Sequence, residues 1–430
     1  MIENSHSLSN CFTKYSMSRK INVSQLKPGM YISDLGLDWF SHGFFRSSFP
    51  VIDDAMVRRV IASGMHEVYI DPARGLDVID APTDKEVLAE MERDMVEVAQ
   101  HLPPARRITA SEEMSRACVV TAEAGRIVRE VMNHARLGLQ VQAEQVEPIV
   151  DRVTQSILRN GSAMIYLTRI KSKDDYTFQH SVAVCSLLVA FCRALDMDEK
   201  TMHLAGIGGL LHDIGKVRVD DAILNKPGPL SRPQFERMKD HVTEGVHILR
   251  ESKSFDPISI QVVEQHHERF DGSGYVKGLA GNAIAQIGQM AAICDVYDAI
   301  TSHRVYSQPM SPHLATAKIF EWSKFHFNPE LAHQFLRIIG IYPVGALVKL
   351  ESERLAIVLE QSESSLMTPV VRAFYDTQRR QAIAPVEIDL SKPLGHGGGD
   401  RIVSHETARH WGIDTATMGG FSPPRKSATP

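Results

Sequence analysis

Three segments of this 430-residue chain would be apolar on almost every side if they were helices. They are residues 178–195, 202–211 and 287–300. A helix that is apolar all round is either buried at the centre of a large domain or spans a membrane. Since the chain has no run of about 18 consecutive apolar residues, no transmembrane helix is expected. The three segments therefore predict the buried centre of a helical bundle.

Polar groups that suit metal binding accompany these segments. His212-Asp213 follows the second segment, Asp295 lies in the third, and His266-His267 begins 54 residues after His212. An ionised aspartate inside an apolar bundle is costly unless it is paired or bound to a metal. Imidazole with carboxylate suits iron, manganese, zinc or nickel, and the absence of a nearby thiolate disfavours a structural zinc site. These residues indicate a polar centre suited to metal-assisted attack on a phosphate ester.

Some of these residues indicate a metal site more strongly than others. Taken alone, His180, His241 and Asp295 are more simply explained as core residues whose polar atoms are satisfied. The pairs His212-Asp213 and His266-His267 are harder to explain by packing. Consecutive histidines point about 100° apart on a helix, so His266 and His267 can address two neighbouring ions. The two oxygens of Asp213 can bridge such a pair of ions.

Composition excludes several classes of protein. The net charge of -5 and the isoelectric point near 6.4 leave no basic surface for duplex nucleic acid. The five cysteines form no CxxC pair, which is typical of reduced cysteines in the cytosol. The opening residues 1–17 are polar and lack the apolar stretch of a signal peptide. We therefore expect a cytoplasmic protein without a membrane partner.

The pattern along the chain predicts a mainly α protein in five parts. Residues 18–80 mix short β-like runs with one helix, which predicts a small α/β or β-rich domain. Residues 84–150 predict a helical connector, either a partner face or, more simply, a solvated packing helix. Residues 151–340 form the helical core, and alternating residues over 341–395 predict a small β appendage. The tail 396–430 is expected to be disordered.

The core resembles an HD-GYP domain, a subfamily of the HD hydrolases that cleave cyclic di-GMP. The resemblance covers roughly 170 residues in an ordered series of motifs, and residues 20–80 resemble a small uncharacterised domain that often precedes it. The matching motifs are Tyr176–Ser181, Leu210–Lys216, Ile223–Leu230, Met238–His241, His266–Tyr275, Gly278-Leu279 and Asp295–Arg304.

The resemblance implies an HD-type bundle that holds two divalent transition-metal ions, iron or manganese. Lys216 would contact the scissile phosphate, Arg304 the other phosphate, and Tyr275 a guanine or the entrance. Asp213 would act in catalysis as the bridging ligand. The implied metal ligands are His180, His212, Asp213, His241, His266, His267 and Asp295.

Four positions depart from the family's pattern. Val276 replaces the proline of the GYP motif, which we expect to change affinity without removing a catalytic atom. Tyr176 stands where members with three metals have a carboxylate, which favours two metals. Ser307 replaces a usual basic residue, so one phosphate contact is expected to be missing. Gln289 stands where the family commonly has arginine.

The sequence thus predicts hydrolysis of cyclic di-GMP to linear pGpG, with a second cut giving GMP. Two alternatives stay open. One is a catalytically weak receptor that binds cyclic di-GMP and signals through residues 18–80, which we otherwise expect to be regulatory. The other is an HD hydrolase for another nucleotide. A homodimer or a signalling protein partner is compatible with either, and the sequence does not choose between them.

Overall fold

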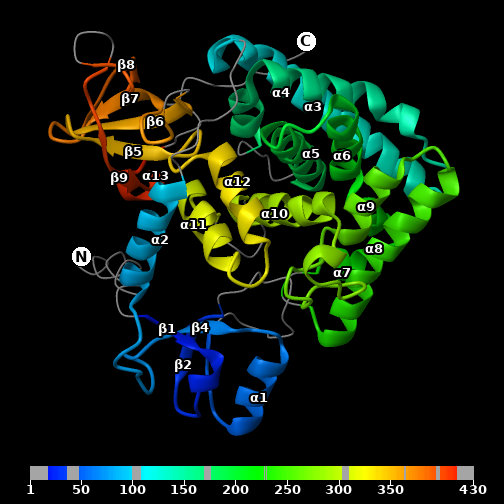
Figure 1. Ribbon diagram of the computed structural model, residues 1–430, viewed down its shortest axis with the longest axis horizontal. Helices are drawn as coiled ribbons and strands as arrows, with labels where there is room; N and C mark the ends of the chain where they lie inside the picture. The colour runs from blue at the N-terminus through cyan, green and yellow to red at the C-terminus, as the bar shows by residue number, and fades with distance from the viewer. Residues whose placement is uncertain are drawn as a thin grey trace, which may run out of the picture. The chain divides into compact units, whose positions relative to one another are not determined.

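The computed structural model describes residues 18–35, 48–98, 108–168, 176–226, 228, 230–302, 309–362, 365–393 and 398–413. The side chains of Glu97, Val98, Tyr176 and Arg409 lie outside this description. The chain divides into two compact units, residues 1–94 with 221–237 and residues 95–220 with 238–430 (Figure 1).

The first unit contains a four-stranded antiparallel sheet with the strand order β1-β4-β2-β3. The strands are β1 (Arg19–Asn22), β2 (Tyr31–Asp34), β3 (Phe49–Pro50) and β4 (Glu67–Ile70). Helix α1 (Asp54–Ala62) begins at Asp53, whose side chain accepts a hydrogen bond from the Met56 amide at 2.7 Å. Alternating residues of the strands and Val60 of α1 form one apolar core. The prediction of a small α/β or β-rich domain is confirmed.

Three further helical segments belong wholly or partly to the first unit. Helix α2 (Asp84–Val98) runs past its boundary at residue 94. Helix α7 (Asp221–Leu224) and the start of α8 (Arg232–Ser252) also fall in this unit.

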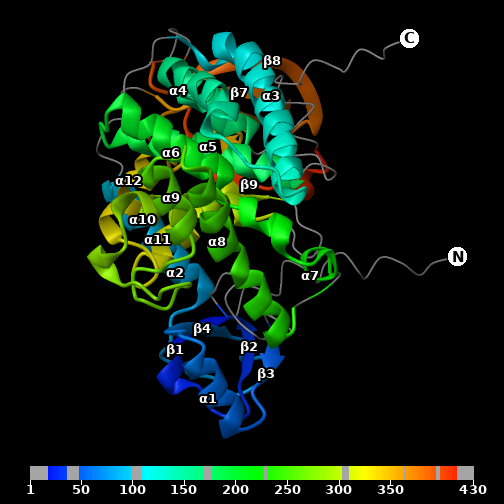
Figure 2. The same cartoon turned by 90° about the vertical axis from the view of Figure 1, so that its right-hand side faces the viewer.

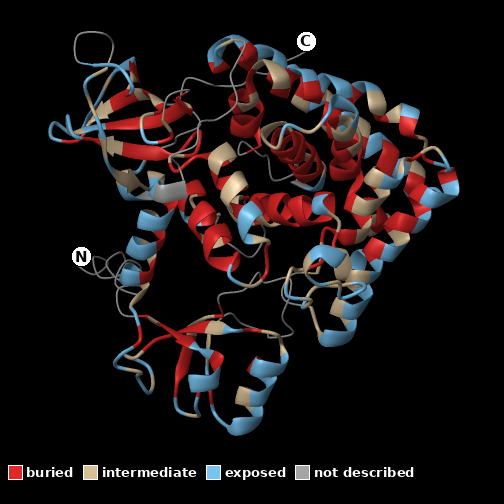
Figure 3. Cartoon of the chain, in the orientation of Figure 1, coloured by how far each residue is buried: buried red, intermediate tan, exposed pale blue. Residues whose placement is uncertain are grey.

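The second unit is a helical bundle. Its central helix is α5, which is buried almost throughout its length (Figure 3). The window Thr177–Ala194 in α5 is long and apolar enough to cross a membrane, but 72% of it is buried inside the bundle, as in the core helix of a globular domain. The helices of the bundle, besides the rest of α8, are α3 (Ala110–Arg136), α4 (Glu147–Leu167), α5 (Tyr176–Ala194), α6 (Glu199–Leu211), α9 (Pro257–Gln265), α10 (Gln286–Thr301), α11 (Pro312–Trp322) and α12 (Pro329–Ile339).

Glycines in α6 bring its backbone close to α4 and α5. A Cβ on Gly209 would lie 3.0 Å from the Cα of Cys185, and one on Gly206 would lie 2.7 Å from a methyl of Val150. Any larger side chain would separate the helices. This close contact fixes the end of α6, where His212 follows, against the middle of the central helix.

Helix α3 corrects part of the domain prediction. It lies alongside α4 (Figure 2) and also packs on α5. Ala117, Ala124 and Val128 of α3 are fully buried in the same apolar core as the bundle helices. The prediction of helix over residues 110–136 is confirmed, but a connector separate from the core is wrong for this part. Its charges suggested a solvated helix because four of its ten buried residues are alanines, which carry little apolar signal.

A five-stranded antiparallel sheet follows the bundle, with the strand order β8-β7-β6-β5-β9. The predicted β appendage is confirmed, but disorder from residue 396 is wrong for residues 402–411. Strand β9 pairs with the free edge of β5, so the tail satisfies backbone groups that would otherwise stay unpaired. The elements are β5 (Leu347–Leu350), β6 (Arg354–Glu360), β7 (Val370–Asp376), β8 (Gln381–Asp389), β9 (Ile402–Glu406) and α13 (Ala408–Trp411).

Candidate metal centre

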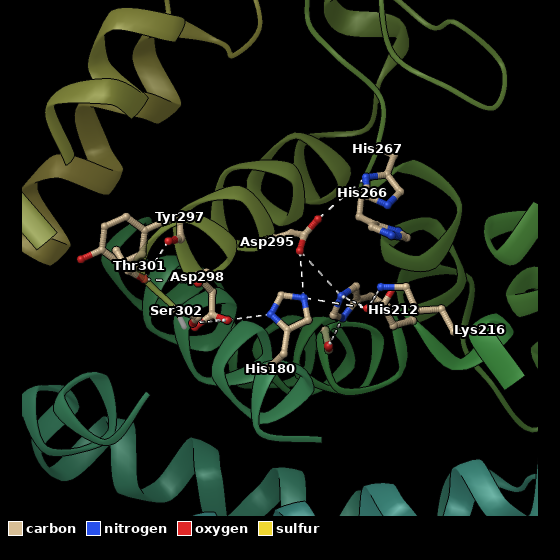
Figure 4. Close-up of polar contacts among 12 residues, drawn as sticks. His180, His212, Lys216, His266, His267, Asp295, Tyr297, Asp298, Thr301 and Ser302 are labelled. Carbon is tan, nitrogen blue, oxygen red and sulfur yellow. Dashed lines mark hydrogen bonds and ion pairs between the residues drawn. The ribbon is translucent and has the colours of Figure 1, made fainter. Parts of the chain in front are cut away.

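Seven predicted ligands converge from five helices of the second unit. They lie near the start of α5, just after α6, within α8, just after α9, and within α10. Figure 4 shows most of them with their side chains turned toward a common centre. Two groups of three have ligand atoms within 4.8 Å of one another: His180, His212 and Asp213, here the first triad, and His241, His266 and His267, here the second triad.

The first triad is completed by a second carboxylate. His180 Nε2 lies 3.0 Å from Asp295 Oδ1 and 3.8 Å from Asp213 Oδ2. His212 Nε2 lies 3.3 Å from the same Asp213 oxygen. All four side chains are at least nine-tenths buried. Two imidazoles and two carboxylates are thus gathered at one point inside the bundle.

The two carboxylates also reach the second triad with their other oxygens. Asp213 Oδ1 lies 3.5 Å from His241 Nε2, and Asp295 Oδ2 lies 3.8 Å from His267 Nδ1. His241 Nε2 and His266 Nε2 are 3.5 Å apart. Each aspartate therefore faces both triads, which is the arrangement expected of ligands shared between two cations.

Helical geometry sets which nitrogen of three imidazoles faces the centre. In each, Nδ1 donates to the carbonyl oxygen three residues earlier in its own helix, because a carbonyl can only accept. The Nε2 lone pair is then left for a cation. The bonds are His212 to Gly209 at 2.9 Å, His241 to Met238 at 2.6 Å, and His266 to Val263 at 2.9 Å.

Burial and neighbouring charges suit these groups to cation binding. Burial lowers the pKa of His241 to about 4 and that of His266 to about 3, so both rings are neutral ligands at pH 7. Burial opposes the charge on Asp213, but Lys216 and His212 outweigh it and hold its pKa well below the usual range. The pKa of Asp295 is likewise held well below its usual range, because His180 and His212 outweigh its burial.

Two unsatisfied atoms give a direct test of whether a metal fits. His212 Nε2 and Asp213 Oδ1 are both buried, and neither makes a hydrogen bond to any described residue. Buried polar atoms of this kind are rare and call for a partner. A cation between the triads would supply one, and imidazole with carboxylate is a donor set that transition metals accept. The residues present therefore fit a metal centre.

Lys216 lies against the shared carboxylate. Its ammonium donates to Asp213 Oδ2 at 2.5 Å, from the short 3-10 helix Ile214–Arg218 that follows α6. Gly215 allows this segment to pass close to α8, since a Cβ there would lie 1.9 Å from the His241 carbonyl oxygen. The lysine thus lies beside the centre.

The loop after His267 places an aromatic ring over the second triad. Tyr275 stacks on His267 with ring centres 4.6 Å apart, and Lys239 lies 5.4 Å from the centre of the tyrosine ring. Glu268 holds this loop: its buried carboxylate accepts hydrogen bonds from the amides of Lys277 at 2.8 Å and Leu279 at 2.9 Å. The sequence analysis did not single out Glu268, although it directly follows the two histidines.

The remaining residues that the sequence singled out lie outside the described residues or have no contact with the triads among the bonds described below. Arg304 and Ser307 lie outside the described residues, as does the side chain of Tyr176. Val276 is described and is 47% exposed. Gln289 is buried, and its side-chain amide donates to the Ile284 carbonyl and accepts from Asn328, so it is a satisfied core residue.

Asp298 was also missed. One of its carboxylate oxygens lies 2.6 Å from His180 Nδ1. The signal that could have found it is a second aspartate one turn after Asp295 in an otherwise apolar helix, where an unpaired carboxylate would be costly.

Comparisons with known proteins agree with this geometry. Residues 18–146 match a domain of unknown function, DUF3391, and residues 165–331 match an HD domain. The chain is 38% identical over 396 residues to a cyclic di-GMP phosphodiesterase of Pseudomonas aeruginosa, covering 92% of this chain and 94% of that protein. It is 38% identical over 127 residues to a 3'3'-cGAMP-specific phosphodiesterase of Vibrio cholerae, covering 29% of this chain and 24% of that protein.

One solved structure is also similar. It is an HD-GYP-type protein from Bdellovibrio bacteriovorus, 18% identical, with a TM-score of 0.45, covering 74% of this chain and 98% of that chain. The match to DUF3391 extends through α3, beyond the boundary at residue 80 that the sequence suggested for the first domain.

Proposed function

This chain belongs to the HD-GYP family of HD-domain phosphodiesterases, and on that premise we propose that it hydrolyses cyclic di-GMP to the linear dinucleotide pGpG. One observation carries the proposal: two triads of ligand atoms share two buried carboxylates, Asp213 and Asp295. A relative of nearly the same length bears the name of this activity.

The centre would hold two divalent transition-metal ions, iron or manganese. When bound, they would lower the pKa of a water molecule and neutralise charge on the phosphate. His180, His212, His241, His266 and His267 offer imidazole nitrogen donors. The ligand set is completed by Asp213 and Asp295, which face both triads.

Charged and aromatic side chains beside the triads would bind the substrate. Lys216 would leave Asp213, whose negative charge a cation would then share, and neutralise the charge that develops on the scissile phosphate. Tyr275 offers a flat ring at the edge of the second triad, on which a guanine could stack. Arg304 would hold the second phosphate through its two-pronged guanidinium group.

The residue at position 176 bears on the product. A tyrosine does not replace a carboxylate ligand, so a third ion has no extra ligand there. We propose two ions and release of pGpG, with a second cut to GMP as the slower step. The protein would act in the cytoplasm on a small cyclic dinucleotide and not on duplex nucleic acid, and residues 18–80 would be regulatory.

Two other functions remain candidates. The similarity to a 3'3'-cGAMP-specific phosphodiesterase favours a different cyclic dinucleotide as substrate. Val276 and Ser307, at positions where the family has proline and a basic residue, favour a receptor that binds cyclic di-GMP with weak catalysis. The seven converging ligands argue against the receptor, since binding alone does not need them.

The test is to incubate the metal-loaded protein with cyclic di-GMP and, separately, with 3'3'-cGAMP, and to separate the products by chromatography. We expect pGpG to accumulate faster than the linear product of cGAMP. The matched control is Asp213→Ala, which should give neither product. Faster cleavage of cGAMP would change the substrate assignment, and tight binding without cleavage would favour the receptor.

A further inference from the structure

His180 lies between two carboxylates. Its Nε2 is 3.0 Å from Asp295 Oδ1, and its Nδ1 is 2.6 Å from Asp298 Oδ2 on the opposite side of the ring (Figure 4). A carboxylate oxygen can only accept, so Nδ1 carries the hydrogen in this bond. Nε2 is the nitrogen that faces the centre, beside Asp295, and it would be the one that binds a cation there.

Asp298 is built into this position. It is 1% exposed and lies on α10, close to one turn after Asp295. The Ser302 hydroxyl lies 3.5 Å from the same Asp298 oxygen that accepts from His180. A buried carboxylate on a central helix is costly unless it is paired or hydrogen-bonded. The short hydrogen bond from His180 offsets the cost of burying this carboxylate.

The other imidazoles of the centre have weaker partners. His212, His241 and His266 donate from Nδ1 to backbone carbonyls of their own helices. His267 has its Nδ1 3.8 Å from Asp295, which is beyond hydrogen-bond distance. Among the described residues of the centre, the carboxylate–histidine pair occurs in the first triad and not in the second.

This difference has a chemical consequence. A carboxylate partner fixes the orientation of a ligating imidazole and raises its strength as a donor, and losing such a partner costs about 10- to 100-fold in metal affinity. A neutral carbonyl orients the ring but adds less electron density. The two triads should therefore differ in affinity although each contains buried nitrogen ligands.

We propose that Asp298 is a positioning residue that makes the first triad the tighter of the two cation positions, so that the ions load in a fixed order. The inference rests on the proposed two-ion centre. Asp298 itself would touch neither ion nor substrate, because His180 lies between it and the centre.

The test is a titration of the full-length, metal-free protein with Co²⁺ alone, followed by visible absorption and by competition with a chelator. The wild type should bind two ions in two resolved steps. Asp298→Asn, which keeps the shape but removes the charge, should weaken the tighter step about 10- to 100-fold and leave the weaker step unchanged. Asp298→Ala should weaken the tighter step at least as much.

The weaker step serves as an internal check on folding, because it depends on side chains from α8 and the end of α9. The matched control is Ser302→Ala, which removes a neighbour of the Asp298 carboxylate but not the carboxylate, and should titrate like the wild type. Two unchanged steps in both Asp298 variants, or equal weakening of both steps, would overturn the proposal.

Failure of the proposed function would look different. Hydrolysis of cyclic di-GMP is measured separately, so a protein that loads cobalt in two steps without cleaving the nucleotide would contradict the function and leave the loading order intact. Binding of cobalt by the wild type in a single step would overturn the loading order, whether or not the protein cleaves the nucleotide.

Discussion

Lys216 Nζ lies 2.5 Å from Asp213 Oδ2, while the other oxygen of that carboxylate lies 3.5 Å from His241. Asp213, a member of the first triad, thus contacts a lysine and also a histidine of the second triad. A cation bound at the triads would share its negative charge and loosen its hold on the ammonium group. The lysine would then be free to follow the charge of a bound phosphate.

Lys216→Ala separates the two roles. We expect the bound metal to remain, because the ligands are untouched, and turnover to fall about 10²- to 10³-fold, because a charge that stabilises the transition state is lost. Elemental analysis and turnover of the same preparation give the measurement. Asp213→Ala, the paired control, should lose metal and activity together. If Lys216→Ala empties the centre, the lysine holds the metal site together and the assigned role is wrong.

Glu268→Gln tests how the loop under Tyr275 is held. The amide of glutamine can accept only through its oxygen, so one of the two backbone N–H groups at Lys277 and Leu279 loses its partner. A buried donor left unsatisfied costs about 1–3 kcal/mol. Denaturant unfolding should show that loss, and the KM for the nucleotide should rise.

The control for this variant is Glu264→Gln, four residues earlier. Glu264 pairs with Lys277 and Arg250, both exposed, and such surface pairs contribute about 1 kcal/mol or less. Equal losses in the two variants would show that Glu268 acts only as a charge and does not organise the loop.

Gly215→Ala tests the close contact behind the centre. The added Cβ would lie 1.9 Å from the His241 carbonyl oxygen, so the backbone that carries His241 must move. We expect loss of metal from the second triad, measured as ions per chain. Gly125→Ala is the matched control, because a Cβ there meets nothing within 4 Å in the middle of α3. It should keep its metal and gain about 0.5–1 kcal/mol of stability. Full metal content in Gly215→Ala would contradict the packing account.

The pH dependence of stability has a contribution from His405 on β9. This ring stacks on His313 at 3.4 Å between centres, and burial lowers its pKa to about 3 from 6.5. Below pH 6.5 the unfolded chain therefore binds a proton that the folded chain does not. The free energy of unfolding should fall as the pH drops from about 6.5 toward 3, by up to ~1.4 kcal/mol per pH unit from this group.

His405→Phe isolates this contribution, because phenylalanine keeps the stacking surface but does not titrate. The variant should lose less stability than the wild type between pH 6.5 and pH 4, measured by denaturant unfolding at each pH. Parallel losses in the two proteins would mean that His405 is protonated in the folded state.

Much of the centre was predictable from the sequence, because its ligands lie in motifs on strongly apolar helices. His212-Asp213 and His266-His267 are recognisable because adjacent polar residues at the end of an apolar helix are costly to bury without a partner. His180, His241 and Asp295 were assigned only through the resemblance. A single polar residue in an apolar helix is ambiguous, and His241 lies in a helix rich in charged residues, where a histidine does not stand out. The structure brings all seven together.

What the sequence could not supply is pairing between distant segments. Asp298 and Glu268 matter through what they contact, and those contacts depend on how α10 and the loop fold against α5 and α9. The burial of α3 was hidden by its alanines and charged residues. Strand β9 was missed because a short run in a tail rich in glycine and serine becomes a strand only when β5 offers its edge.

The most direct test of the account is to titrate iron or manganese into the metal-free protein and to measure hydrolysis of cyclic di-GMP at each ratio of ions to chain. The account predicts that pGpG formation tracks the fraction of chains carrying two ions and is absent from chains carrying none. Full activity in metal-free protein, or no hydrolysis by folded protein that carries two ions, would contradict it.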